Sequence, residues 1–134
     1  MDAGMRHKRV LIVDDERDLV EVLALRLTAA WGYSVAVAHD GAEGLRKAAA
    51  TQPDVILLDL SMPEVDGWEM CRRLLDDPQT RAIPLVVMTA WSGPDVRERA
   101  AKEGVARVLT KPLDDKDLLE ALRGLAGTER AAAG

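Results

Sequence analysis

Five polar side chains stand at the points where apolar runs of this sequence end. They are Asp14 and Asp15 after residues 10–13, Asp59 after 55–58, Thr89 after 85–88 and Lys111 after 105–109. Ligands of an open parallel sheet bind beyond the carboxyl ends of its strands, which is where all five residues would lie. A lone Asp at such a junction is more often a helix cap, but five converging polar residues indicate a binding site.

Carboxylates dominate this predicted site, and three of them in one crevice repel one another. A divalent cation or protonation would relieve the repulsion, and oxygen-only ligands suit a hard ion such as Mg²⁺. Lys111 adds a positive charge and Thr89 a hydroxyl donor, so the set could hold phosphoryl oxygens. One carboxylate could itself act as the nucleophile and form an aspartyl phosphate.

The elements that would position these residues alternate along the chain. Apolar runs bounded by Asp, Gly or Pro are typical of strands covered on both faces. Three strong runs suit central strands (10–13, 55–58 and 85–88), and two weaker ones suit the edges (35–38 and 105–109). Helical stretches lie between them, at 16–30, 42–50, 67–75, 94–104 and from 114 to 122 or 124. The pattern predicts an α/β fold with a doubly wound, five-stranded parallel sheet.

Residues that start or stop helices support these bounds. Gly32 and Gly104 stand where the first and fourth helices should end, Asp66 could cap the third, and Pro94 fits a first helical turn. Glu16 follows the Asp pair at the start of the first helix. It could touch a metal ion, but its place in a first turn favours a cap or dipole role.

Composition restricts the class of protein. The 134 residues include no phenylalanine and one tyrosine, yet 48% are hydrophobic, so the core should be aliphatic. A chain of this length typically forms one domain, which we place at 1–126, with a flexible tail at 127–134. The net charge is −5 and the Lys and Arg residues form no cluster, which argues against nucleic-acid binding by this domain itself.

Cysteine usage and hydropathy exclude further classes. Cys71 is the only cysteine, so an internal disulfide and a thiolate metal cage are excluded, and a buried packing role is expected. His7 and His39 lack other candidate ligands at suitable spacing, which argues against a zinc site. No run resembles a signal peptide or reaches the length of a membrane span. We therefore expect a cytoplasmic protein with no membrane partner.

Taken together, the motifs resemble those of the response-regulator receiver domains of two-component signalling. The matching residues are Asp14-Asp15, Asp59 with Met62-Pro63 and Asp66-Gly67, Thr89-Ala90 and Lys111-Pro112. The resemblance runs from about residue 8 to 124, nearly the whole chain. It implies a flavodoxin-like (βα)5 fold with strand order 2-1-3-4-5, in agreement with the edge strands assigned above.

The resemblance also implies a role for each site residue. Asp59 would accept a phosphoryl group from the phosphohistidine of a sensor histidine kinase or phosphotransfer protein. Asp15 and Asp59 would bind Mg²⁺ directly, Asp14 would bind it through water, and the backbone carbonyl of Ser61 would complete the set. Lys111 would pair with the phosphoryl group, and the peptide bond between Lys111 and Pro112 would be cis.

Switching would follow from the added charge. A phosphoryl group brings about −1.5 to −2 units of charge, and Thr89 would move its hydroxyl onto it. The segment 91–104 would then shift and change the face seen by a downstream protein, which the resemblance places on the fourth and fifth helices. The chemistry would serve only the protein's own phosphorylation and autodephosphorylation. With ten residues after Gly124, the chain would be a stand-alone receiver or an excised part of a larger protein.

Two positions depart from the family pattern. Receivers usually carry Tyr or Phe three residues before the lysine, where this chain has Val108, and often Phe after the proline, where it has Leu113. Val108 either fills a strand position or removes the coupling between the switch threonine and an aromatic ring. Trp91 either takes over that aromatic role or is an exposed loop residue.

Two alternative functions remain. A Mg²⁺-dependent phosphohydrolase would also form an aspartyl phosphate, but it needs a second acid or base and a cap over the substrate. Ser61 stands where such an enzyme would have an Asp, and no insertion is long enough for a cap. A degenerate receiver that binds partners without phosphorylation is the other alternative, and the complete set of five site residues argues against it.

Overall fold

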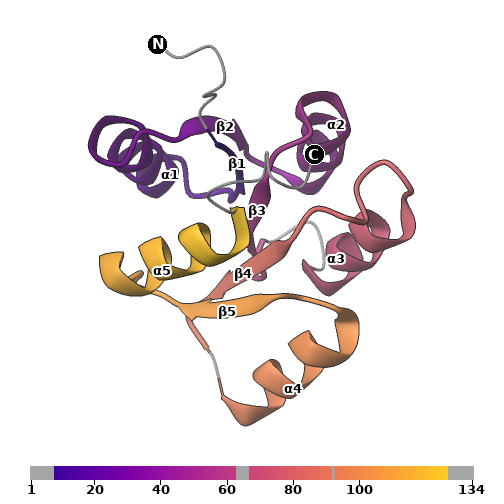
Figure 1. The fold of residues 1–134 in the computed structure, drawn as a ribbon. Coiled ribbons are helices and arrows are strands. Elements are labelled where there is room, and N and C mark those ends of the chain that lie inside the picture. Colours follow the sequence, from indigo (N-terminus) through magenta and orange to yellow (C-terminus); the bar gives the residue numbers. More distant parts are fainter. Residues whose placement is uncertain (1–7, 63–66, 92, 127–134) are drawn as a thin grey trace.

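Strands and helices alternate along the chain in the computed structural model, which describes residues 8–62, 67–91 and 93–126 (Figure 1). The strands are β1 (Arg9–Val13), β2 (Ser34–Ala38), β3 (Val55–Asp59), β4 (Leu85–Thr89) and β5 (Arg107–Thr110). The helices are α1 (Arg17–Leu25) with a π-helical turn η1 (Arg26–Ala30), α2 (Gly41–Thr51), α3 (Gly67–Asp76), α4 (Pro94–Glu103) and α5 (Asp115–Ala126). All paired strands are parallel in the order β2-β1-β3-β4-β5, which confirms the predicted doubly wound sheet and its edges.

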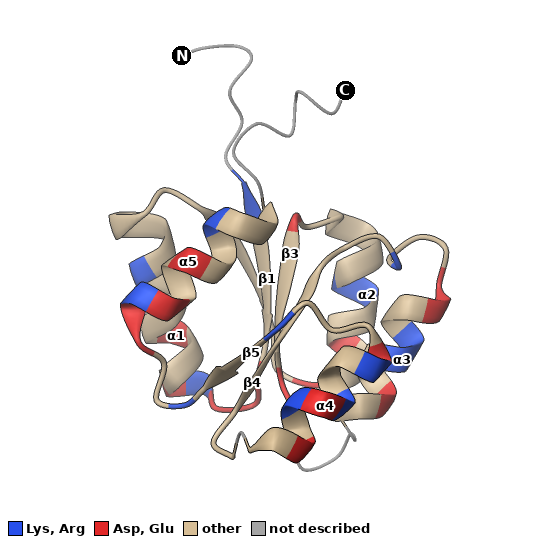
Figure 2. Ribbon diagram, turned by 60° about the horizontal axis from the view of Figure 1, so that its bottom comes forward, with Lys and Arg blue, Asp and Glu red and all other residues tan. Residues whose placement is uncertain are grey.

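Helices cover both faces of the sheet. Helices α1 and α5 lie on one face and α2, α3 and α4 on the other (Figures 1 and 2). Successive strand residues point to opposite faces, so each strand feeds two clusters: Val108 packs on the α2–α3–α4 side and Leu109 on the α1–α5 side. The largest fully buried side chains are all Leu, Ile or Met, as expected of a chain without phenylalanine. Cys71 is buried in the first cluster, which confirms its packing role.

The first helix differs from its expected form. Instead of running as one α-helix to residue 30, α1 ends at Leu25 and continues as the π-helical turn η1. The Thr28 hydroxyl donates to the carbonyl oxygens of Ala24 and Leu25, at 3.0 and 3.1 Å, and such back-bonding by threonine distorts helices. Gly32 follows with a φ of 76°, so the predicted stop at this glycine is confirmed.

The last strand begins two residues later than predicted. Val105 was expected to open it, but the N–H of Val105 donates to the carbonyl of Ala100 at 2.9 Å, within the end of α4. Gly104 adopts a φ of 86° and closes that helix as predicted. Because the turn around Gly104 uses the N–H of Val105, the first N–H to reach β4 is that of Ala106, which donates to Leu85 at 2.9 Å, and paired strand residues start at Arg107.

Two other helix starts are explained by their first residues. Asp40 accepts a hydrogen bond from the N–H of Glu43 at 2.8 Å and so caps α2, while Pro94 is the first residue of α4, as predicted. The predicted cap Asp66, together with Pro63, His7 and the tail 127–134, lies outside the described residues. Among the residues described, no helix is long and apolar enough to cross a bilayer.

Candidate functional site

Three carboxylates meet at the carboxyl ends of two neighbouring strands. Asp14 and Asp15 follow β1 and Asp59 is the last residue of β3, which pairs with β1. One oxygen from each lies within 4.8 Å of the others, and Figure 2 shows acidic segments gathered where these strands end. Asp14 and Asp59 are 1% and 3% exposed, and Asp15 is the most exposed of the three. The sheet therefore brings together carboxylates that lie 45 residues apart in sequence.

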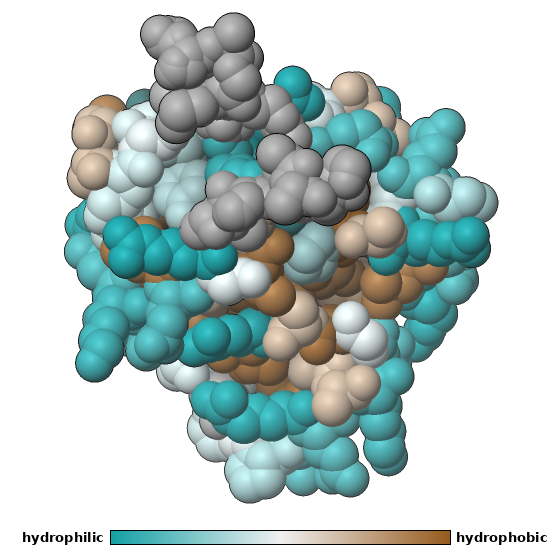
Figure 3. Space-filling view, viewed as in Figure 1, coloured by the Kyte–Doolittle hydropathy of each residue, from teal (hydrophilic) through white to brown (hydrophobic). Residues whose placement is uncertain are grey.

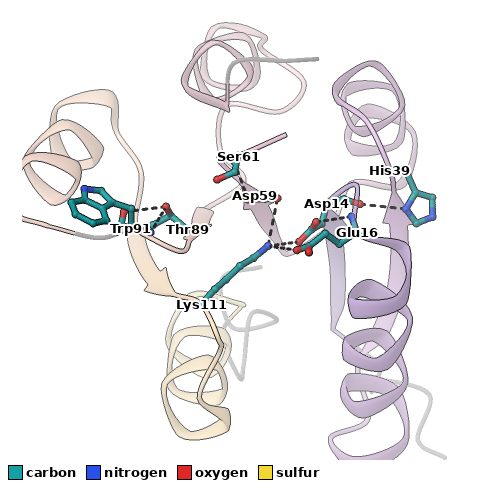
Figure 4. Close-up of polar contacts among 8 residues, drawn as sticks. All are labelled: Asp14, Glu16, His39, Asp59, Ser61, Thr89, Trp91 and Lys111. Carbon is teal, nitrogen blue, oxygen red and sulfur yellow. Dashed lines mark hydrogen bonds and ion pairs between the residues drawn. The ribbon is translucent and has the colours of Figure 1, made fainter. Parts of the chain in front are cut away.

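Local backbone turns hold the two buried carboxylates in place. The N–H of Glu16 donates to Oδ1 of Asp14 at 3.0 Å, and the N–H of Ser61 donates to Oδ1 of Asp59 at 2.9 Å (Figure 4). The second oxygen of each carboxylate, Oδ2, faces Lys111. Ser61 thus contacts the site through its N–H, and its carbonyl as a metal ligand stays a prediction.

Close packing after β3 fixes where α3 begins. A Cβ on Gly67 would lie 2.7 Å from Cα and 3.0 Å from the carbonyl oxygen of Leu60, the residue that follows Asp59. Such contacts with backbone leave no room for a side chain. Glycine at this position therefore lets the helix start against the end of the strand that carries Asp59.

Lys111 is the cation of the site. Its Nζ lies 2.9 Å from Asp14 Oδ2, 3.2 Å from Glu16 Oε1 and 3.5 Å from Asp59 Oδ2 (Figure 4). Burial opposes the charge of Lys111, but the hydrogen bond and charge of Asp14 and the charge of Asp59 outweigh it and raise the lysine pKa. The peptide bond from Lys111 to Pro112 is cis. Lys111 is therefore held as a charged ammonium group facing Asp59.

Asp59 is electrostatically unfavourable as a lone anion. Burial raises the pKa of its carboxyl group, and the neighbouring charge of Asp14 raises it further, against the opposing effects of the Ser61 N–H and Lys111. One ammonium group does not neutralise three carboxylates. The oxygen donors, their spacing and the raised pKa together fit a hard divalent cation such as Mg²⁺.

Thr89 ends β4, but its hydroxyl is turned toward its own loop. It donates to the carbonyl of Trp91 at 3.0 Å and accepts from the N–H of Trp91 at 3.0 Å (Figure 4). The Trp91 side chain itself is 76% exposed. Of the two interpretations of Trp91, the structure shows the exposed loop residue, although its backbone is tied to Thr89.

Val108 lines a cavity between α4 and β5. The cavity has a volume of about 460 Å³ and is also lined by Arg97, Ala100 and Ala101 of α4 and by Asp117 of α5. Figure 3 shows apolar surface exposed over β5 on this side of the molecule. Small side chains at Val108, Ala100 and Ala101 leave this space beside the strand.

A second cavity adjoins Lys111. It has a volume of about 490 Å³ and includes Leu19 and Val22 of α1 and Pro112 and Leu113 of the loop after β5. Leu19 and Val22 are exposed on the surface of α1. An apolar surface thus lies directly beside the charged site.

Two residues near the site take part in contacts that their sequence positions did not reveal. Glu16 occupies the cap position of α1, but its side chain makes no capping hydrogen bond, so the cap part of the expected cap or dipole role is wrong. Its carboxylate pairs with Lys111 instead. His39 Nδ1 lies 3.3 Å from the carbonyl oxygen of Asp14 (Figure 4). The only signal available for Glu16 was its place directly after the Asp pair.

Comparisons with known proteins agree with this arrangement. The family model described as "Response regulator receiver domain" matches residues 10–123. The response regulator PleD of Caulobacter vibrioides is 45% identical over 117 residues, which cover 87% of this chain and 26% of PleD. The chain therefore spans about a quarter of this curated relative.

Solved structures show the same fold. The chemotaxis protein CheY4 of Vibrio cholerae superposes with a TM-score of 0.83 at 30% identity, covering 90% of this chain and 99% of CheY4. The receiver domain of the sensor histidine kinase PA1611 from Pseudomonas aeruginosa, which holds a magnesium ion in its active-site cleft, gives 0.81 at 27% identity. That match covers 92% of this chain and 100% of the other.

Proposed function

Because this chain belongs to the family of response regulator receiver domains, we propose that it is a signalling switch phosphorylated on Asp59. One observation carries the proposal: Lys111 Nζ lies 3.5 Å from Asp59 Oδ2, beside three carboxylate oxygens within 4.8 Å of one another. A buried nucleophile, an acidic metal site and a fixed ammonium group are what transfer of a phosphoryl group to a carboxylate requires.

The proposed reaction joins a carboxylate oxygen of Asp59 to the phosphorus of a phosphohistidine. The phosphorus–nitrogen bond of the donor breaks, and the imidazole leaves with the bonding electron pair and takes up a proton from solvent. Asp14, Asp15 and Asp59, with the Ser61 carbonyl, would hold Mg²⁺, which when bound supplies positive charge to the carboxylates and the phosphoryl oxygens. Lys111 would donate its N–H groups to the phosphoryl oxygens and so stabilise the negative charge on them. Hydrolysis of the aspartyl phosphate would later reset the switch.

Thr89 would carry the signal away from Asp59. Its hydroxyl has both of its hydrogen bonds on the Trp91 backbone, and the proposed move toward a phosphoryl oxygen would release that loop. Pro94 begins α4 only three residues after Trp91, so the released loop would reposition the start of this helix. A downstream protein that contacts α4, β5 and α5 would read the change.

The proposed donor is a sensor histidine kinase or phosphotransfer protein in the cytoplasm. A phosphohistidine that reaches Asp59 must bring its protein against the surface beside Lys111. That surface carries the exposed Leu19 and Val22 and the cavity next to Pro112. Exposed apolar side chains next to a charged site suit a protein partner and not a small hydrophilic substrate alone.

An intact-mass experiment tests this function. The protein is incubated with Mg²⁺ and acetyl phosphate, beside an Asp59→Asn variant and a sample with chelator. We expect one added phosphoryl group on the unmodified chain, and none on the variant or without Mg²⁺. No mass gain on the unmodified chain would refute the proposal. Phosphate release that continues through many rapid turnovers would support the phosphohydrolase alternative instead.

A further inference from the structure

Glu16 contacts the phosphorylation site without belonging to the set of residues assigned above. It directly precedes α1 with extended backbone angles, φ −84° and ψ 92°, and its N–H is fixed to Asp14 Oδ1 at 3.0 Å. The backbone angles and this hydrogen bond determine the direction in which the Glu16 side chain leaves the backbone. The carboxylate then reaches Lys111 Nζ at 3.2 Å and makes no capping hydrogen bond to the helix.

Lys111 donates hydrogen bonds to Asp14 and Glu16 and forms a longer ion pair with Asp59. An ammonium group has three N–H donors, and three carboxylates lie around it: Asp14 at 2.9 Å, Glu16 at 3.2 Å and Asp59 at 3.5 Å. The closer two hold the ammonium group on the β1 side of the site. For Lys111 to move from this position toward a phosphoryl oxygen on Asp59, it must weaken one of these two hydrogen bonds.

Glu16 is the partner that can be released at least cost. The Asp14 side chain is 2% exposed, so loss of its cation would leave a buried anion without compensation. The Glu16 side chain is 60% exposed and can be hydrated as soon as Lys111 leaves. The geometry therefore distinguishes a permanent partner of Lys111 from an exchangeable one.

We infer that Glu16 is a positioning residue that, with Asp14, holds Lys111 on the β1 side of the site in the resting state and gives it up to the incoming phosphoryl group. The inference rests on the proposed function of Asp59. Glu16 opposes phosphoryl transfer because its contact with Lys111 must weaken first. It thereby sets how readily Asp59 is phosphorylated by an anionic donor.

Three variants test this role. Glu16→Gln removes the charge, and Glu16→Asp keeps the charge on a side chain one methylene shorter, which withdraws it from Lys111. Glu21→Gln is the matched control, since Glu21 is exposed on the same helix. With acetyl phosphate and Mg²⁺, we expect both Glu16 variants to be phosphorylated about two- to fivefold faster than the unmodified chain, the scale of one exposed ion pair. Glu21→Gln should leave the rate unchanged.

The state of the lysine gives an independent measurement. Nuclear magnetic resonance of the Lys111 ammonium group, without phosphodonor, should show faster hydrogen exchange in both Glu16 variants and no change in Glu21→Gln. A faster rate in Glu16→Gln alone would mean simple charge repulsion and would overturn the positioning role, as would unchanged rates and resonances in both variants. If the unmodified chain takes up no phosphoryl group, the proposed function fails. If the unmodified chain is phosphorylated and both Glu16 variants match it in phosphorylation rate and Lys111 hydrogen exchange, only the role of Glu16 is refuted.

Discussion

Thr89 and Trp91 form a closed two-way hydrogen-bonded pair: the threonine hydroxyl donates to the tryptophan carbonyl and accepts from the tryptophan N–H, both at 3.0 Å. The Trp91 ring projects from this pair into solvent. The Thr89 hydroxyl therefore already has two hydrogen bonds in this structure. Any new partner for Thr89 must replace two existing bonds to the loop before α4.

Replacing Thr89 with valine should uncouple this loop from the site. Thr89→Val keeps the side-chain shape and loses both hydrogen bonds, which we expect to lower the free energy of unfolding by about 0.5–1.5 kcal/mol. Phosphorylation of Asp59 should persist, but the change in Trp91 emission that accompanies it should disappear. Tryptophan fluorescence is measured before and after addition of acetyl phosphate, and the signal of a Trp91→Phe variant is subtracted to remove the contribution of the other two tryptophans. Thr89→Ser keeps the hydroxyl and should restore the response, and a full response in Thr89→Val would contradict the coupling.

Replacing Asp59 with asparagine should stabilise the metal-free fold at neutral pH. The carboxyl pKa is raised in the folded chain, chiefly by burial, so the folded state binds a proton more readily than the unfolded state. Stability from this group is present at low pH and is lost as pH rises through the folded pKa. Asp59→Asn removes that loss and should raise the unfolding free energy at pH 7.

Urea unfolding at a series of pH values measures this difference between the two chains. The difference in unfolding free energy between Asp59→Asn and the unmodified chain should shrink as the solution is acidified below the ordinary carboxyl pKa. It should also shrink on addition of Mg²⁺, which stabilises the unmodified chain by binding only its folded state. An asparagine variant that is less stable at pH 7 would show that Asp59 is already well compensated without metal.

Removing the Lys111 ammonium group should destabilise the fold and stop phosphorylation. Lys111→Met leaves Asp14 and Asp59 buried without their cation, which we expect to cost about 2–4 kcal/mol of unfolding free energy. Lys102→Met is the matched control, because Lys102 pairs with Glu98 at 4.0 Å on an exposed helix face. Thermal unfolding should show a large drop in Tm for the first variant and little change for the second. Equal drops would mean that Lys111 acts as an ordinary surface charge.

Filling the cavity beside β5 should stabilise the protein. Val108→Phe places an aromatic ring in the space of about 460 Å³ next to Ala100 and Ala101, and cavity filling commonly adds about 0.5–2 kcal/mol. Val87 pairs directly with Val108 across β4 and β5 but is fully buried. Val87→Phe should therefore overpack the core and cost about 1–3 kcal/mol. If urea unfolding shows both variants destabilised, the cavity is not available to a ring.

The sheet and the grouping of its polar residues could be predicted because they depend on repeated local patterns. Apolar runs mark the strands, and the parallel arrangement sends every strand end to one edge. Asp14, Asp59 and Lys111 meet there whatever the intervening loops do. Composition likewise predicted the aliphatic core.

The misjudged residues are those whose contacts depend on distant parts of the chain or on one helix end. Glu16 has the local context of a cap, and only the position of Lys111, 95 residues later, redirects its carboxylate. Val105 belongs to an apolar run, yet the left-handed turn at Gly104 uses its N–H before the strand begins. The local sequence does not show which of two possible partners the Glu16 carboxylate or the Val105 N–H will bind, because that depends on which groups the folded chain brings close.

The sheet separates two hydrophobic clusters that share no helix, with Val108 in one and Leu109 in the other. The surface beside Lys111 is lined by α1 and the loop after β5, whereas the cavity beside Val108 is lined chiefly by α4 and β5, with Asp117 of α5. Mutations on the surface of α1, the proposed contact for a phosphodonor, can therefore accumulate while the packing of the α2–α3–α4 side is preserved. If the chain works as proposed, recognition of the donor on α1 and of the target on α4 can change independently, while α5 and the polar edge of the sheet adjoin both surfaces.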